Sequence, residues 1–270
     1  MSQSEMGPPG STALAGGSNT NQPVSPVRVW VLTLAAGLIA GLASGTIEEV
    51  VHARHGRQST VVNTASSSPF VAGKEAEEKS KVLRAAENLE TTLIFGSLGA
   101  MLGLALGFAG GAARGSAPMT MAAASGGLIL GAAVGVAAIK VVLPVYNWQY
   151  LADSNDLIMG ILCQIALAMV LGASGGAAFG AGLEGSKCAL RAALGGLLGA
   201  AAGALIHGLV VAFAFPLART SSLISEMWGT RLFALLAVVI LASAGAASGA
   251  LYRAGARDLS PGSPKRKALP

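Results

Sequence analysis

The stretch Gly127-Leu-Ile-Leu-Gly-Ala-Ala-Val-Gly135 decides the fold class, because it places a glycine at every fourth position of an apolar run. Small residues at this spacing form a flat stripe along one helix face, so a neighbouring backbone can approach closely. Each copy of the pattern lies in an apolar run long enough to cross a bilayer. The three copies are Gly127/Gly131/Gly135, Gly37/Gly41/Gly45 and Gly195/Gly199/Gly203.

The composition excludes a soluble domain. Of the 270 residues, 53% are hydrophobic and only 11% are charged, whereas soluble domains carry about 25% charged residues. The mean hydropathy is +0.62. The 37 glycines are roughly twice the usual share and would weaken helices in water. We therefore expect an all-α integral membrane protein.

The apolar runs predict six transmembrane helices, each of around 20 residues. Pro144 and Pro216 follow the third and fifth runs, where proline commonly ends a helix. The Ser-, Gly- and Pro-rich segment 1–27 and the basic segment 254–270 are expected to be disordered tails. The predicted helices cover about residues 28–48, 91–113, 118–143, 156–181, 188–214 and 231–253.

The helices also repeat in pairs. Residues 106–113 and 171–178 share the pattern Leu-Gly-x-x-Gly-Gly-Ala-Ala, and residues 244–250 carry a weaker copy. We predict three tandem two-helix glycine-zipper repeats, related by a pseudo-threefold axis along the membrane normal. The alternative is that Gly/Ala-rich helices align through composition alone. The repeats are residues 28–113, 118–181 and 188–253, and the further packing glycines are Gly99, Gly103, Gly107, Gly172, Gly176, Gly245 and Gly249.

Basic residues predict the orientation. Arg28, Arg114, Lys187 and Arg191 share one side with the basic C-terminal tail, whereas the loop near 144–156 has no Lys or Arg. The positive-inside rule then places both termini in the cytoplasm, and the Ala/Gly bias favours a bacterial inner membrane. In the long loop 49–90, we expect the first half to be irregular and 74–90 to be helical, as a solvated extension or a docking surface.

Ionisable residues inside apolar helices are rare and often functional. The candidates are Glu48, Glu49, Lys140 and His207, with His52 just beyond. They follow the last glycine of a stripe by three to seven residues. The ionisable residues of the first, third and fifth predicted helices therefore lie at nearly the same depth in the membrane.

The helical phase selects among these residues. Glu49 and His207 lie about 40° from the last glycine of their stripe and His52 about 20°, whereas Lys140 is turned about 100° further round. We hypothesise a polar cluster of Glu49, His52, His207 and Lys140 that binds a proton, an ion or an anionic group. The alternatives are that Glu48 and Lys140 mark the membrane boundary and that His207 is a neutral core residue.

Catalytic and metal chemistry find little support. Glu49-Val-Val-His52 has the Glu-x-x-His spacing of di-iron bundles, but such a site needs a second copy. We expect no metal, no cofactor, no disulfide between Cys163 and Cys188, and no enzyme activity. Aromatic residues make up 5% of the chain, which argues against nucleic-acid binding.

Two function classes remain. The first is a small-solute or ion permeation or transport protein that uses the polar cluster. The second is a non-catalytic structural or assembly subunit of a membrane complex, favoured by the scarcity of polar residues and the one long loop. The expected partners are the lipid bilayer and either other membrane proteins or further copies of the chain.

Overall fold

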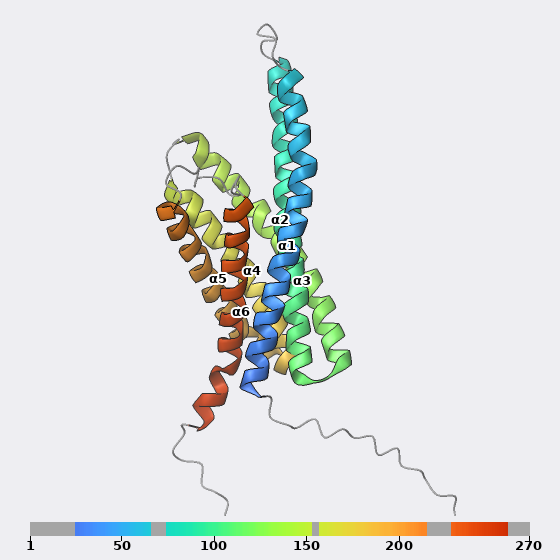
Figure 1. Ribbon diagram of the computed structural model, residues 1–270, viewed down its shortest axis with the longest axis vertical. Coiled ribbons are helices and arrows are strands. Elements are labelled where there is room, and N and C mark those ends of the chain that lie inside the picture. The colour runs from blue at the N-terminus through green and yellow to red at the C-terminus, as the bar shows by residue number, and fades with distance from the viewer. Residues whose placement is uncertain (1–24, 66–73, 153–156, 215–227, 259–270) are drawn as a thin grey trace, which may run out of the picture.

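A computed structural model describes residues 25–65, 74–152, 157–214 and 228–258, and these residues form an all-helical bundle (Figure 1). Within these ranges no strand occurs, so the all-α prediction is confirmed. The helices are α1 Pro26–Ala65, α2 Lys74–Arg114, α3 Ala117–Ala152, α4 Leu157–Glu184, α5 Ser186–Ala214 and α6 Trp228–Asp258.

Each helix contains an apolar segment of 25 to 30 residues, long enough to cross the hydrocarbon core of a bilayer. Large side chains such as Val31, Ile129 and Leu198 point outward from these segments, as expected for surfaces that face lipid. The chain is therefore built as a polytopic membrane protein. The segments are Pro26–Val51, Asn88–Arg114, Ala117–Tyr146, Gly160–Glu184, Ser186–Val211 and Trp228–Tyr252.

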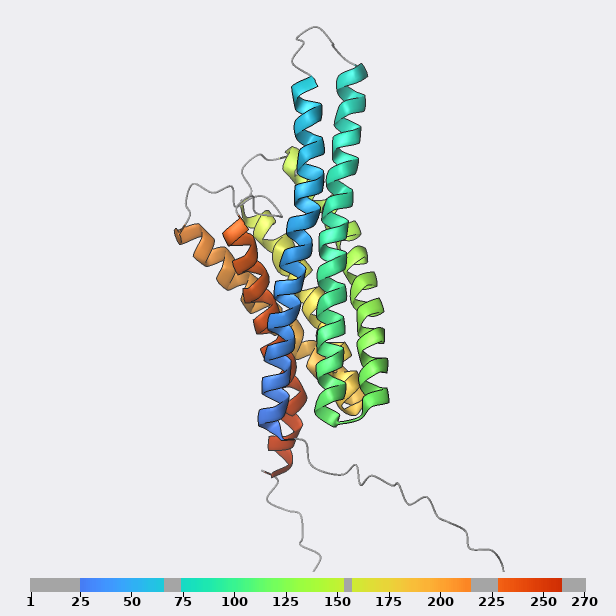
Figure 2. The ribbon, with the colours of Figure 1, turned by 45° about the vertical axis from the view of Figure 1, so that its right-hand side comes forward.

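Helices α1, α3 and α6 are longer than the sequence predicted. Residues 49–65, expected to be irregular, continue α1, and α1 and α2 run side by side beyond the rest of the bundle (Figure 2). No proline interrupts this part of α1. The prediction of a helix over 74–90 is confirmed. Pro144 was wrongly expected to end the third helix: α3 continues to Ala152, because one proline removes a single backbone hydrogen bond without preventing helix on either side.

Two glycines make the tightest connections. Gly115, between α2 and α3, has φ +78°, and Gly185, between α4 and α5, has φ +88°. This left-handed conformation ends a helix in a sharp turn and suits glycine because it has no Cβ. Both turns lie at the end of the bundle where α1 begins and α6 ends (Figure 1), and they fold α2 onto α3 and α4 onto α5.

These hairpins pack backbone against backbone. A Cβ at Gly103 would collide with the carbonyl of Gly127, and one at Gly127 would collide with the carbonyl of Gly103. Gly99 and Gly131 are related in the same way. So are Gly172 of α4 with Gly196 of α5, and Gly195 of α5 with Gly245 of α6. Further predicted packing glycines that face a neighbouring backbone are Gly107, Gly135, Gly176, Gly199, Gly203 and Gly249.

The glycine face of α1 differs, because it meets mostly side chains. Gly37 lies against Ser243, Gly41 against Leu236 and Gly45 against Leu232, all from α6. The most extensive helix contacts join α2 to α3, α4 to α5 and α5 to α6. The contact between α1 and α6 is smaller and depends on side-chain packing.

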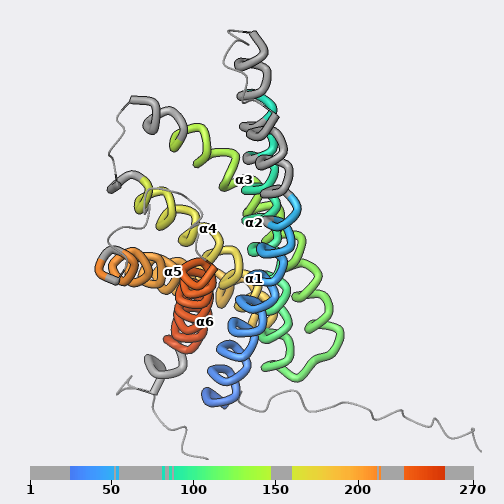
Figure 3. The backbone as a smooth tube through the Cα atoms, turned by 45° about the horizontal axis from the view of Figure 1, so that its top comes forward, coloured from blue at the N-terminus to red at the C-terminus, as the bar shows by residue number. Residues whose placement is uncertain are grey.

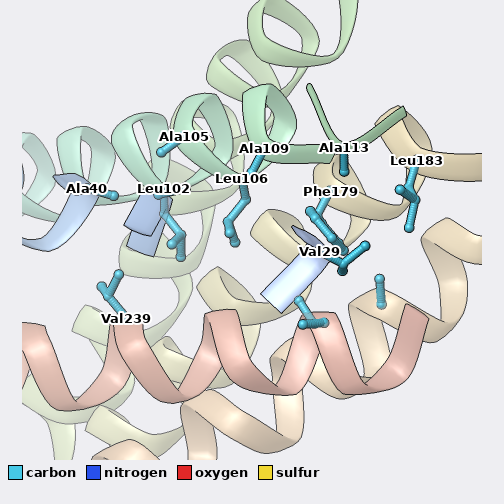
Figure 4. Packing of buried hydrophobic residues seen from close by; sticks show 14 of the residues in the cluster. Val29, Ala40, Leu102, Ala105, Leu106, Ala109, Ala113, Phe179, Leu183 and Val239 are labelled. Carbon is cyan, nitrogen blue, oxygen red and sulfur yellow. The ribbon is translucent and has the colours of Figure 1, made fainter. Parts of the chain in front are cut away.

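The buried core lies toward the end of the bundle that carries the termini. Leu102 and Leu106 of α2, Phe179 of α4 and Val239 of α6 are almost fully buried. Phe179 lies beside Val29 of α1, whereas Val239 lies on the side of Ala40 (Figure 4). The spans of α2 and α4 are the most buried, and that of α3 the least. Toward the other end, α4 and α5 lean away from α1 and α2 (Figure 3), and a cavity opens among the helices there.

Candidate functional site

A cavity of about 110 Å³ lies between α1, α2, α4, α5 and α6. Most of its wall is apolar, with side chains that include Ile94, Phe95, Leu98, Leu171, Leu235 and Val238. Four polar residues also line it, one from each of α1, α4, α5 and α6. They are Glu48, Gln164, His207 and Arg231.

The ionisable residues of the cavity lie at one membrane level. Glu48, His207 and Arg231 are each about 21 residues from the end of their span on the side of the termini, which is roughly 30 Å at 1.5 Å per residue. That distance matches the thickness of the hydrocarbon core of a bilayer. With these spans across a bilayer, the polar end of the cavity would lie close to the headgroup boundary, at the opposite end of the bundle from the Gly115 and Gly185 turns.

Arg231 is the most unusual of these residues. Its side chain is only 6% exposed, and its Nη2 donates a hydrogen bond of 2.9 Å to Oε2 of Glu49, which is 47% exposed. Its Nε and Nη1 atoms are buried and have no hydrogen-bond partner among the described residues. A buried guanidinium is costly in an apolar environment unless its N–H groups are paired. The ion pair with Glu49 provides a partner for Nη2 alone and leaves the other buried N–H groups of Arg231 unpaired among the described residues.

His207 reaches the same cavity from α5. Its ring lies 6.0 Å from that of Phe233, measured between centroids, with the planes tilted by 42°, and it hydrogen-bonds the backbone of Thr230. Its Nε2 atom is buried without a partner among the described residues. Imidazole nitrogen can donate or accept a hydrogen bond, so a second polar atom is left facing the cavity.

Glu48 and Gln164 complete the polar wall. Glu48 is 6% exposed, Gln164 is half-buried, and both have interaction partners of their own. Including Glu49, the group has two carboxylates, one guanidinium, one imidazole and one neutral amide. Serine, threonine and cysteine are not among the residues that line the cavity, so the wall supplies hydrogen-bond donors and charges and no hydroxyl or thiol nucleophile.

The structure places the predicted residues in different surroundings. Glu49 and His207 both extend the glycine face of their helix onto α6, where Glu49 meets Arg231 and His207 meets Phe233. Glu48 lines the cavity, while Glu49 stands beside it. Lys140 is exposed on α3 and does not line the cavity.

The side chain of His52 lies outside the described residues, so its membership of the cluster stays a prediction. Within the part of the chain that is described, no three His, Cys, Asp or Glu side chains are grouped closely enough to hold a metal ion. Cys163 and Cys188 are both free thiols and both buried.

Arg231 was not predicted as a site residue, because it is the first residue of the sixth predicted helix, 231–253. The sequence carried no signal for this role, because an arginine in the first turn of an apolar span lies near the membrane boundary, where basic side chains are common. Comparisons with protein families, curated proteins and solved structures give no match. The observations that bear on function therefore come from the residues that line the cavity.

Proposed function

We propose that the protein is a small-solute or ion permeation protein whose entry site is the cavity between α1, α2, α4, α5 and α6. The observation that carries this proposal is Arg231, buried at the membrane boundary with two nitrogens that have no partner among the described residues. Buried charges in membrane segments are rare and commonly mark the path of a substrate or ion.

The packing around the cavity supports a one-sided opening. Leu98 and Leu171 line it and also belong to the buried core, so a solute would have to pass through the core to reach the face of the termini. The contact between α1 and α6 offers a barrier that can loosen, because it is made mainly by side chains, including those of Leu232 and Leu236, which can change rotamer. The glycine contacts of the hairpins offer no such freedom, because they join backbone to backbone.

Flux in liposomes tests this proposal. Purified protein would be reconstituted, and entry of protons, chloride and acetate would be followed with enclosed pH- and chloride-sensitive dyes. We expect at least one flux above that of protein-free liposomes, and a tenfold or greater loss in Arg231→Gln. Lys140→Gln is the matched control, since it removes a cation outside the cavity. Equal fluxes in protein-containing and protein-free liposomes would reject the proposal.

A second candidate is a structural or assembly subunit of a membrane complex. The paired extension of α1 and α2 beyond their spans (Figure 2) favours it, because two helices projecting from a membrane offer a docking surface. Gentle extraction from native membranes, followed by mass and composition of the purified particle, separates the two candidates. Stoichiometric co-purification with other polypeptides would support the subunit, and a monomer or homo-oligomer would support permeation.

We further propose a non-catalytic protein of the bacterial inner membrane with both termini in the cytoplasm. The distribution of Lys and Arg supports this orientation. We also propose that the chain consists of three two-helix repeats related by a pseudo-threefold axis. The shared patterns at 106–113 and 171–178 support it, as do the equivalent glycine turns at Gly115 and Gly185.

A further inference from the structure

We propose that Arg231 and His207 bind an oxyanion, a carboxylate or phosphate group, at the polar end of the cavity. Arg231 Nε and Nη1 and His207 Nε2 are all buried without a partner among the described residues, and both side chains line the same cavity. The proposal names a ligand class for the site assigned above and so rests on the same cavity. It concerns equilibrium binding alone and does not require flux.

The chemistry of the orphan atoms selects this ligand. Guanidinium nitrogens are donors only, so the missing partners must be acceptors. Carboxylate and phosphate oxygens form the strongest hydrogen bonds with arginine, through charge as well as geometry. A metal cation, or a ligand that offers only donors, would leave the buried N–H groups of Arg231 unpaired.

The surroundings indicate where such a group comes from. The polar end of the cavity lies near the headgroup boundary, and the rest of its wall is apolar, including Phe95, Leu98 and Val238. An amphiphile with an acidic headgroup satisfies both parts of the site, since its head pairs with Arg231 and its chain contacts the apolar wall. Free phosphate or acetate carries the same oxyanion without the chain.

Neighbouring charges define how strongly the anion is held. Glu48 and Glu49 of α1 oppose it, whereas Arg231 of α6 attracts it. The described lining residues of α2 are apolar, and α4 adds the neutral amide of Gln164. Because Glu49 already holds Nη2 of Arg231, it competes directly with the ligand for this guanidinium.

Because of that competition, substitutions of Arg231 and of Glu49 should change ligand binding in opposite directions. Full-length protein in dodecyl maltoside would be mixed with dioleoylphosphatidic acid, dioleoylphosphatidylcholine, sodium phosphate or sodium acetate, and bound ligand would be counted by native mass spectrometry. We expect one phosphatidic acid to bind at least tenfold more tightly than phosphatidylcholine. Arg231→Gln should abolish this preference, Glu49→Gln should strengthen binding several-fold, and Lys140→Gln should leave it unchanged.

Each outcome decides a point. Binding of phosphatidic acid alone identifies a lipid headgroup, and binding of phosphate or acetate at similar affinity identifies a soluble anion. If Arg231→Gln does not fold, the stronger binding expected for Glu49→Gln, measured against the unchanged binding expected for Lys140→Gln, still carries the test. Glu49→Gln binding that is weaker than wild type, or a preference that survives Arg231→Gln, would overturn the inference. Oxyanion binding without any flux would retain the inference and reject the permeation proposal.

Discussion

Two adjacent glycines on α3, Gly126 and Gly127, allow the effect of close helix packing on stability to be measured separately from the effect of helix propensity. Gly127 faces α2, and a Cβ there would collide with the backbone carbonyl of Gly103. Gly126 is the neighbouring residue, yet a Cβ there would meet nothing within 4 Å. The substitutions Gly127→Ala and Gly126→Ala therefore add the same methyl group to the same helix, one against a backbone and one toward the bilayer.

The two variants should change stability in opposite directions. Alanine favours helix over glycine by up to about 1 kcal/mol in water, so Gly126→Ala should be neutral or slightly stabilising. Overpacking typically costs about 1–3 kcal/mol, and Gly127→Ala belongs at the upper end because a carbonyl in a helix cannot rotate aside. We expect the two free energies of unfolding to differ by about 3 kcal/mol, or roughly a hundredfold in the unfolding equilibrium.

The chain contains its own reporters for this measurement. Cys163 and Cys188 are free and buried, so their reaction with a maleimide in increasing SDS follows unfolding. Helix content by circular dichroism gives a second reading, and wild-type protein sets the reference. Gly127→Ala should react at a clearly lower SDS fraction than Gly126→Ala. Coincident curves for the two variants would refute the close backbone contact between α2 and α3.

Three further substitutions test other parts of the bundle in the same SDS titration. Phe179→Ala should cost about 3 kcal/mol or more, because this side chain is fully buried in the core; a shift no larger than that of an exposed residue such as Phe213→Ala would contradict the packing. Gly115→Ala should cost roughly 1–2 kcal/mol, since φ is +78° while nothing lies within 4 Å of a Cβ; an unchanged midpoint would argue against the left-handed turn. Ser44→Ala should stabilise by about 1 kcal/mol, because its buried hydroxyl oxygen has no partner among the described residues; a loss of stability would reveal a partner for that hydroxyl.

The membrane spans could be predicted from the sequence because they depend on a local property. An apolar run of sufficient length has one stable arrangement in a bilayer, a helix that satisfies its own backbone hydrogen bonds. Where the sequence is polar, this constraint disappears, so the continuation of α1 through residues 49–65 could not be predicted from hydropathy. The prediction that the third helix ends at Pro144 was wrong for a related reason, since a proline weakens a helix locally without specifying where the helix ends.

The site was predictable only in part. Helical phase predicted that Glu49 and His207 extend their glycine faces, and in the structure both faces lead to α6. It did not predict that α6 supplies the partner, because Arg231 carries no repeat pattern and its role depends on which helices become neighbours. Lys140 was grouped by depth alone, but α3 turns its glycine face toward α2 and leaves Lys140 exposed.

The uneven use of glycine connects the packing to the cavity. Contacts between α2 and α3, between α4 and α5, and between α5 and α6 join backbones directly, and such contacts cannot loosen gradually because there is no side chain to rearrange. The contact of α1 with α6 uses Leu232, Leu236 and Ser243 and is bridged at its outer end by Glu49 and Arg231. Breaking that single ion pair would leave only side-chain packing between α1 and α6. A ligand that takes Arg231 from Glu49 would therefore act on a helix contact beside the cavity that is made mainly by side chains.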